Sequence, residues 1–173
     1  MRRHLPWILL LAALACQAAP AVNVTVSFIH PEQFIDAKDA RGESDKRLLA
    51  MAKHLQWLGS RYLAADQTLR VEVLDVDLAG RERFLMRSGQ EVRIDNGKAD
   101  WPEIKLRYTL QAGGQVVQQG EEVVTDMGYL AHANSYDSGD PLRYEKQMLE
   151  RWFRGHFEHA PATDTTKAAG SGG

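Results

Sequence analysis

The stretch that decides the fold is residues 104–124, which read I-K-L-R-Y-T-L-Q-A-G-G-Q-V-V-Q-Q-G-E-E-V-V. Apolar and polar residues alternate from Ile104 to Gln111, which is the two-residue period of a strand with one buried face. Gly113-Gly114 then supplies the backbone freedom that a tight hairpin turn needs, and Gln115 to Val124 forms the returning strand. The sequence therefore predicts an antiparallel hairpin over these residues.

Further strands are predicted on the amino-terminal side of this hairpin. Residues 22–29 form a predicted half-buried strand, because apolar and polar side chains alternate from Val22 to Phe28. The apolar face of residues 69–78 changes midway, which indicates either a bulge or a move from an edge to a covered position. A short strand is expected near residues 91–94, closed by an Asp95-Asn96-Gly97 turn. Residues 81–90 are charged, and we expect a loop or a short helix there.

Two helices complete the expected set of elements. The first runs from about Asp45 to Ala64, with Ser44 as its N-cap. The second is capped by Asp140 and has Pro141 at its first position. Apolar residues recur at helical spacing in both segments. The expected buried residues are Leu48, Met51, Ala52, Leu55, Leu58 and Tyr62 in the first helix, and Tyr144, Met148, Leu149, Trp152, Phe153 and Phe157 in the second.

This order of elements predicts an α+β fold of two layers. A mostly antiparallel sheet of about four to five strands would carry two main helices on one face. We expect one domain over residues 22–159, preceded by a signal peptide over residues 1–21. Residues 160–173 contain Ala, Thr, Gly and Ser without periodicity, and we expect this tail to be disordered.

The amino-terminal segment has the order of parts found in secretory leaders. Arg2 and Arg3 are followed by an apolar run that is too short to span a bilayer, which takes ~20 residues. Ala19-Pro20-Ala21 then provides an A-x-A pattern suited to a signal peptidase. A buried amino-terminal helix is the alternative. Cleavage after Ala21 would leave Val22 as the first residue of a periplasmic or secreted protein.

Cys16 adds a second interpretation of this leader. Ala13-Leu14-Ala15-Cys16 resembles a lipoprotein box, although Ala13 stands where Leu is usual. In that case Cys16 would carry lipid and become the first residue. The protein would then be anchored to a membrane, whereas cleavage after Ala21 would leave a chain without cysteine.

The composition of the processed chain excludes several classes of partner. Removal of residues 1–21 leaves 19 basic and 23 acidic residues, a net charge of −4. Mild acidity argues against nonspecific nucleic-acid binding, which needs clustered Lys and Arg. No apolar stretch after residue 21 is long enough for a transmembrane helix, so a membrane would be a partner only through a lipid on Cys16. No cofactor motif is recognised.

Carboxylates could carry chemistry at the ends of two strands. Asp75 and Asp77 lie two residues apart, so their side chains leave the same face of a strand. Asp126 follows the returning hairpin strand, and His132 lies in the loop beyond. Oxygen ligands of this kind could hold calcium or magnesium, and a carboxylate could act as a base. The alternative is that Asp75 and Asp77 end a strand, cap nearby backbone and face water.

Two tryptophans are candidate binding residues. Trp101, within Asp100-Trp101-Pro102, could be an exposed anchor for a protein partner or a glycan. The alternative is a corner, in which Pro102 begins a strand and Trp101 fills the end of the core. Trp57 lies beside the apolar stripe of the first helix and could border a groove.

Five stretches of the sequence resemble one known family. They are V-T-V-S-F, D-V-D-L-A-G, A-D-W-P-E-I-K-L-R-Y-T-L, G-E-E-V-V-T-D-M-G-Y and Y-E-K-Q-M-L-E-R-W-F, in this order. Together they resemble domain of unknown function 3016, a family of small exported bacterial proteins, from about Val24 to Phe157. The resemblance implies an envelope or secreted location, and it brings no established activity, cofactor or catalytic residue.

Three functional hypotheses follow from the sequence. The first is a non-enzymatic binding or accessory module of the cell envelope, with an envelope protein or a glycan as its partner. The second is a metal-dependent hydrolase or metal-binding protein that uses Asp75, Asp77, Asp126 and His132. The third is an outer-membrane-associated lipoprotein anchored through Cys16. The second hypothesis predicts that the carboxylates converge in one concave pocket.

Overall fold

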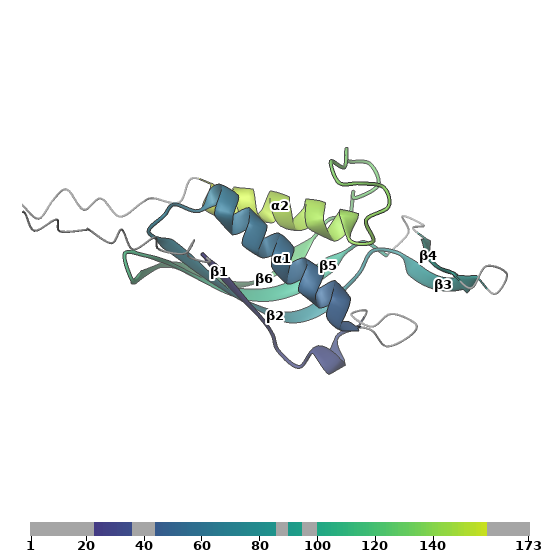
Figure 1. Ribbon diagram of the computed structural model, residues 1–173, viewed down its shortest axis with the longest axis horizontal. Coiled ribbons are helices and arrows are strands. Elements are labelled where there is room, and N and C mark those ends of the chain that lie inside the picture. Colours follow the sequence, from purple (N-terminus) through teal and green to yellow (C-terminus); the bar gives the residue numbers. More distant parts are fainter. Residues whose placement is uncertain (1–22, 36–43, 86–89, 95–99, 159–173) are drawn as a thin grey trace, which may run out of the picture.

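The computed structural model describes residues 23–35, 44–85, 90–94 and 100–158. Its elements are β1 (Val24–Phe28), the short 3-10 helix η1 (Pro31–Gln33), α1 (Ser44–Tyr62), β2 (Gln67–Asp77), β3 (Arg81–Leu85), β4 (Gln90–Ile94), β5 (Glu103–Ala112), β6 (Gln115–Thr125) and α2 (Arg143–Phe157). Four strands form one sheet in the order β1-β2-β5-β6, in which β1 and β2 are parallel and the other neighbours antiparallel. Both helices cover the same face of this sheet (Figure 1). The predicted two-layer α+β fold is confirmed.

The core lies between the sheet and the two helices. The predicted apolar positions of both helices are buried, apart from half-buried Ala52, Tyr62 and Tyr144. Opposite them, the sheet contributes buried Val24, Leu69, Val71, Val73, Ile104, Leu106, Tyr108 and Leu110. Each large apolar side chain buried in this way contributes about 1.5–3 kcal/mol, so this interface stabilises the domain more than any other.

The β5-β6 hairpin forms as the sequence predicts, with β6 at the edge of the sheet. Gly113 and Gly114 have φ angles of 57° and 80°, a left-handed backbone that glycine adopts without strain. The change of apolar face within β2 is a bulge, because the pairing with β5 shifts between Val73 and Asp75. A second shift, at Val117 in β6, lies close to the hairpin turn and leaves Gln118 to Thr125 in regular register.

The face of the sheet away from the helices is polar. Arg107 of β5 donates to Glu72 of β2 at 3.0 Å and to Glu121 of β6 at 2.9 Å, so charge pairs run across three strands. Lys105 also contacts Glu121 at 3.2 Å. Because these groups bond to one another at the surface, this face needs no second layer.

The expectation of a loop or short helix over residues 81–90 is wrong. Residues 81–85 form β3, which pairs with β4 in a separate two-stranded sheet. This hairpin extends from one end of the domain (Figure 1). The sequence R-E-R-F-L has no alternation of apolar and polar residues, and in the described part of the chain β3 pairs with β4 outside the main sheet. A pattern of burial therefore could not reveal it.

The start of the second helix is also corrected. Helix α2 begins at Arg143 rather than at Pro141, and its N-cap position is Leu142. Asp140 still accepts a hydrogen bond from the Leu142 backbone N–H at 2.9 Å, and its carboxylate also contacts Lys146. The predicted cap is therefore present, but it serves a turn that precedes the helix.

Several expectations fall outside the described residues. They concern the leader over residues 1–21, Cys16, the Asp95-Asn96-Gly97 turn and the tail over residues 160–173. Among the helices that the structure does describe, none is both long enough and apolar enough to cross a membrane.

Candidate functional site

Asp126 is the buried carboxylate at the carboxyl end of β6. Its backbone N–H donates to the Pro102 carbonyl at 3.4 Å, and its Oδ1 accepts from the Gly128 N–H at 3.1 Å. These two bonds form because β6 ends in a tight turn beside the start of β5. The side chain is only 8% exposed, so its position is set by the fold rather than by solvent.

Arg151 and His132 meet this carboxylate from two other elements. Arg151 of α2 donates to Asp126 Oδ2 at 2.8 Å, and Nδ1 of His132, from the following loop, lies 3.2 Å from Oδ1. Arg151 Nη1 also lies 2.6 Å from His132 Nδ1. A guanidinium can only donate, so Nδ1 acts as the acceptor and a neutral His132 ring carries its hydrogen on Nε2. A fixed positive charge thus already neutralises Asp126.

A groove of about 380 Å³ lies beside this cluster, between β6 and α2. Its apolar lining comes from Val123, Val124, Met148 and Trp152, while Glu122, Asp126 and Arg151 contribute charged groups to the same lining. The groove therefore follows the outer strand of the sheet and combines apolar contact with polar groups. Such a surface suits recognition of a ligand, and the described residues that line it include no serine or cysteine.

Glu122 accepts hydrogen bonds from both layers at the groove. Trp152 Nε1 donates to it at 3.1 Å and the Tyr108 hydroxyl at 3.2 Å, while His156 Nε2 lies 3.1 Å away. Burial alone would raise the pKa of this carboxyl, but the bonds from Trp152, Tyr108 and His156, with the charge of His156, hold the pKa below its ordinary value. Glu122 therefore stays ionised and fastens α2 to β6.

A second polar cluster connects α1 and the loop that precedes α2 to α2. Glu150 of α2 accepts a hydrogen bond from Tyr136 at 2.7 Å and one from Tyr62 at 3.0 Å. His54 of α1, only 7% exposed, contacts the Lys146 carbonyl through Nε2 at 3.1 Å. Burial is the main cause that lowers the pKa of His54 to about 4, and burial followed by the bond to Glu150 raises the pKa of Tyr136.

The predicted carboxylates do not gather in one pocket. Asp75 accepts from the Ile35 and Val76 backbone N–H groups at 3.3 and 2.9 Å, and it lies opposite Lys105 on the face of the sheet away from the helices. Asp77 lies opposite Glu103 of β5. Asp126, by contrast, contacts Arg151 on the helix-covered side. Of the predicted group, the structure brings together Asp126 and His132.

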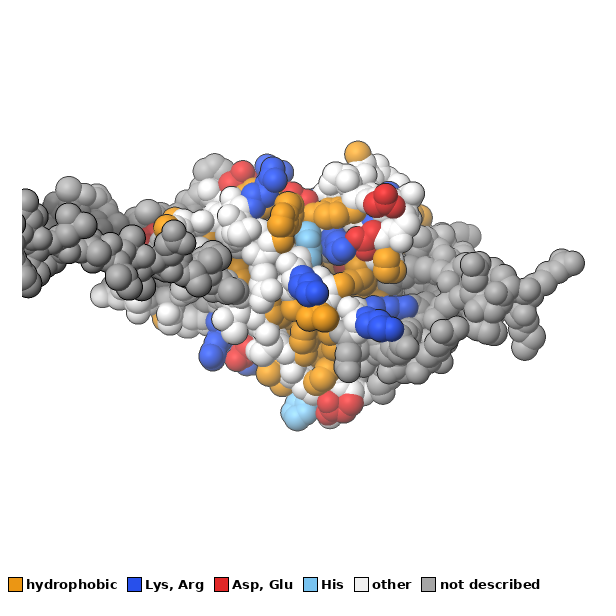
Figure 2. Space-filling view, in the orientation of Figure 1, with side chains coloured by type: hydrophobic (Ala, Val, Ile, Leu, Met, Phe, Trp, Pro, Cys, Tyr) orange, Lys and Arg blue, Asp and Glu red, His pale blue; other side chains and the backbone are white. Residues whose placement is uncertain are grey.

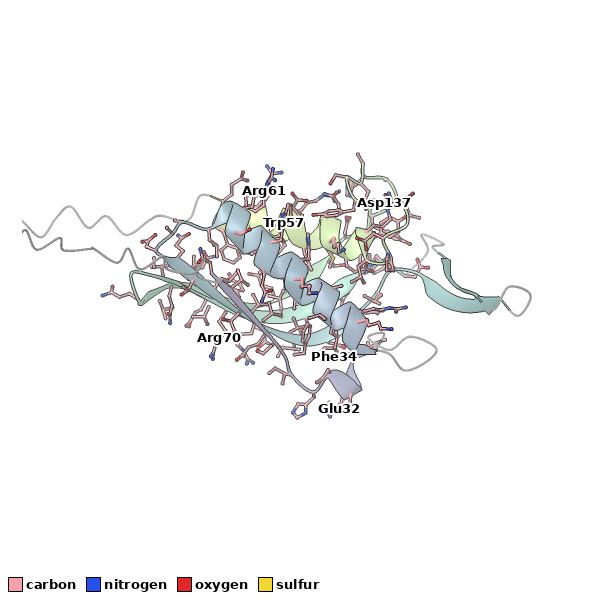
Figure 3. The ribbon with its side chains drawn as sticks, viewed as in Figure 1. Glu32, Phe34, Trp57, Arg61, Arg70 and Asp137 are labelled. Carbon is pink, nitrogen blue, oxygen red and sulfur yellow. The ribbon has the colours of Figure 1, made fainter. Side chains whose placement is uncertain are left out.

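The two candidate tryptophans differ in their surroundings. Trp101 is half-buried next to buried Pro102, directly before β5, as the corner interpretation expects. Trp57 is 44% exposed on α1, where its ring stacks on His54 and lies under Arg61 (Figure 3). Their roles in binding stay predictions.

Among the described residues, no group of three or more His, Cys, Asp or Glu side chains is arranged to hold a metal ion. The metal hypothesis therefore stays a prediction. Sequence reasoning missed Arg151, Glu122 and the cluster around Glu150 because these residues follow ordinary helix or strand patterns. Their positions in α2 and β6 carried no local signal of the partner that each one meets.

Comparison with known proteins gives one match. The family described as "Protein of unknown function (DUF3016)" matches residues 22–155, which include every described element except the last residues of α2. No curated protein and no solved structure matches the chain. Because the match extends over most of the sequence and over nearly all of the folded domain, the chain belongs to the DUF3016 family.

Proposed function

We propose that this protein is an exported, non-enzymatic binding module of the cell envelope. In this proposal, β6 and the adjoining groove take up an extended segment of a partner protein. The leader over residues 1–21 supports export, and the outer edge of β6 supports the mode of binding. That edge is the single observation on which the proposal depends.

Strand β6 is the last strand of the main sheet, and no described strand pairs with its outer side. An edge strand presents unpaired backbone N–H and C=O groups, which can add a further strand from another chain. Val116, Val117 and Val123 are exposed along it. The bulge at Val117 disturbs only the part near the hairpin turn, so Gln118 to Thr125 would receive the added strand.

The groove supports recognition of side chains as well as backbone. Every second residue of an added strand would point to the helix side, where Val124, Met148 and Trp152 form an apolar surface. Arg151 and Glu122 could meet polar groups of the same segment. A protein segment fits these features better than a glycan, because a glycan cannot pair with the backbone of an edge strand.

Site-specific photo-crosslinking in the native cell tests this proposal. A photoreactive residue at Val123 should give a discrete adduct whose mass identifies one envelope protein. The matched position is Thr68, which is exposed on the inner strand β2. Adducts of equal amount at Thr68 and Val123, or no protein adduct at Val123, would contradict binding along β6. An adduct with glycan alone would replace the protein partner by a carbohydrate.

Export is tested separately by intact mass of the protein from envelope fractions. A chain that starts at Val22 supports the secretory leader, and a chain that starts at an acylated Cys16 supports the lipoprotein alternative. A full-length chain found only in the cytosol would contradict both.

The contact between Asp126 and His132 favours one second candidate, a metal-binding site. A metal ion there would have to displace the guanidinium of Arg151 from the carboxylate. Thermal unfolding with added Ca²⁺, Mg²⁺ or Zn²⁺ tests the idea. A metal-dependent rise in Tm that disappears in Asp126→Asn would support a site at Asp126, and an unchanged Tm with all three ions would argue against it.

A further inference from the structure

Helix α1 carries an excess of positive charge within an acidic protein. Between Ser44 and Tyr62 there are four basic residues and one acidic residue, Asp45, a net charge of +3, whereas the whole chain has a net charge of −2. The buried face of α1 is apolar apart from His54, whereas the basic side chains of Lys46, Lys53 and Arg61 are exposed. This asymmetry sets the outer side of α1 apart from the rest of the surface.

The exposed residues of α1 recur at intervals of three or four, which places them on one side of the helix. We call this surface the α1 ridge. It consists of Leu49, Lys53, Gln56, Trp57, Ser60 and Arg61. Figure 2 shows hydrophobic and basic side chains following one another along the helix on this face. Trp57 and Arg61 lie toward its carboxyl end (Figure 3).

Contacts within α1 restrict the conformation of the Trp57 side chain in the α1 ridge. The Trp57 ring stacks on His54 with 5.6 Å between ring centroids, and Arg61 lies 5.5 Å from the centroid of the Trp57 ring. Leu49 is 54% exposed and Trp57 44% exposed. An exposed ring that is already ordered by contacts with His54 and Arg61 loses little conformational entropy when a ligand covers it.

From this combination we infer that the α1 ridge binds the surface of an anionic lipid bilayer. Lys and Arg attract anionic headgroups, and tryptophan is the side chain that most favours the interface between headgroups and acyl chains. Leu49 would enter the same interfacial layer. The α1 ridge lies on the helix layer, so this contact leaves the polar face of the sheet free (Figure 1). The inference uses no residue of β6 and stands independently of the proposed function.

The test is flotation of the processed chain, residues 22–173, with two kinds of vesicle. One kind contains phosphatidylglycerol and phosphatidylcholine, and the other contains phosphatidylcholine alone. We expect binding to the anionic vesicles and a decrease of that binding with added salt. Each cation near an anionic surface increases partitioning about fivefold, so Lys53→Ala and Arg61→Ala should each lower it by about that factor.

Two matched controls separate the α1 ridge from general charge and hydrophobicity. Arg70→Glu changes the charge by the same amount as Lys53→Glu, but Arg70 is exposed on the opposite face of the sheet. Val116 is 53% exposed, almost the same as Leu49, and it lies on β6. Lys53→Glu and Leu49→Ser should therefore weaken binding to anionic vesicles, whereas Arg70→Glu and Val116→Ser should leave it unchanged.

Several results would overturn the inference. These are the absence of binding to anionic vesicles, equal binding to both kinds of vesicle, and equal loss in Lys53→Glu and Arg70→Glu. Binding to an acidic peptide that is sensitive to Lys53→Glu, without binding to vesicles, would assign the α1 ridge to a protein partner instead. Far-ultraviolet circular dichroism of each variant ensures that a loss of binding does not reflect unfolding.

Discussion

The two helices pack on the same sheet, but their polar residues are used in different ways. Along α2, Glu145, Gln147, Glu150, Arg151 and His156 each bond to another element of the domain. Along the outer side of α1, Lys53 and Gln56 have no hydrogen bond or ion pair with any other described residue. These residues of α2 serve the fold, because another part of the domain engages each of them. The outward residues of α1 instead remain available to an external ligand.

The strongest test of this contrast is to weaken the attachment of α2. Phe153 is fully buried, and its ring lies 4.9 Å from that of Phe157 and 6.2 Å from that of Tyr62 on α1. Phe153→Ala should lower the free energy of unfolding by about 3–5 kcal/mol, because it leaves a cavity between both helices and the sheet. Urea unfolding measures the change. Arg154→Ala, at the exposed next residue, should leave the free energy of unfolding nearly unchanged.

The buried histidine of α1 should make the domain sensitive to acid. The pKa of His54 is about 4 in the folded protein and ordinarily 6.5, so the unfolded chain binds the extra proton first. Stability from the neutral ring is complete above pH 6.5 and is lost as the pH falls toward 4. A fall of the pKa from 6.5 to about 4 corresponds to a contribution of about 3 kcal/mol to the free energy of unfolding.

Thermal unfolding across this pH range measures the loss. His54→Gln cannot titrate, so its stability should fall less between pH 6.5 and 4 than that of the wild type. His30→Gln provides the control, since His30 is exposed on the η1 segment. A wild-type dependence that persists unchanged in His54→Gln would show that other groups control acid unfolding.

The hydrogen bonds between Glu122 and α2 allow the contribution of the polar contacts of α2 to stability to be measured. Glu122→Gln keeps the shape of the side chain but removes the charge that accepts from Trp152 and pairs with His156. Hydrogen bonds to a charged group are each worth about 1.5–3 kcal/mol when fully buried, so a loss of about 1–2 kcal/mol is expected at this partly exposed site. Glu121→Gln, the same change on the outer face, should lower stability clearly less, because solvent screens its ion pairs with Lys105 and Arg107.

The difference in free energy of unfolding between the wild type and Glu122→Gln should depend on pH. The pKa of Glu122 is lowered by folding, so the stabilisation is present above the pKa of the unfolded chain and is lost as the pH falls through the folded value. Equilibrium unfolding near pH 7 and at strongly acidic pH would show the convergence of wild type and Glu122→Gln. A constant difference between them would mean that shape, and not charge, matters at this position.

The smallest effect on stability is expected on the outer side of α1. Lys53→Ala and Leu49→Ser should change the free energy of unfolding by no more than about 0.5 kcal/mol, because neither side chain is buried. Chemical denaturation provides the measurement. A large loss from either variant would show that the α1 ridge is part of the fold, and the contrast between the helices would then fail.

Much of the fold follows from local patterns. Segments that bury one face against the main core have a period of two or of about 3.6 residues, and these are β1, β2, β5, β6 and both helices. The change of face in β2 even located its bulge. Strand β3 and its pairing with β4 were not predicted. The two strands form a separate sheet, and their charged sequence has no periodic pattern of apolar residues.

The candidate site was predictable only where the chain brings residues together locally. Asp126 and His132 are six positions apart and follow the same strand, so their proximity could be expected from order along the chain. Arg151 reaches the same carboxylate from α2, at a sequence separation of 25 residues. Asp75 has the same chemistry as Asp126 but lies on the opposite side of the sheet, which depends on the pairing of β2 with β5.

By itself, the amino-acid sequence determined the type of the main elements, the two-layer architecture and the family. The reason is that the spacing of apolar residues along the chain reveals which face of each strand or helix is buried. The tertiary structure alone decided that Glu122, Glu150 and Arg151 hold α2 in place and that no other described element covers the outer sides of β6 and α1. Hydrogen bonds depend on distances of a few ångströms between residues far apart in the chain. The order of the strands and the packing of the helices set those distances.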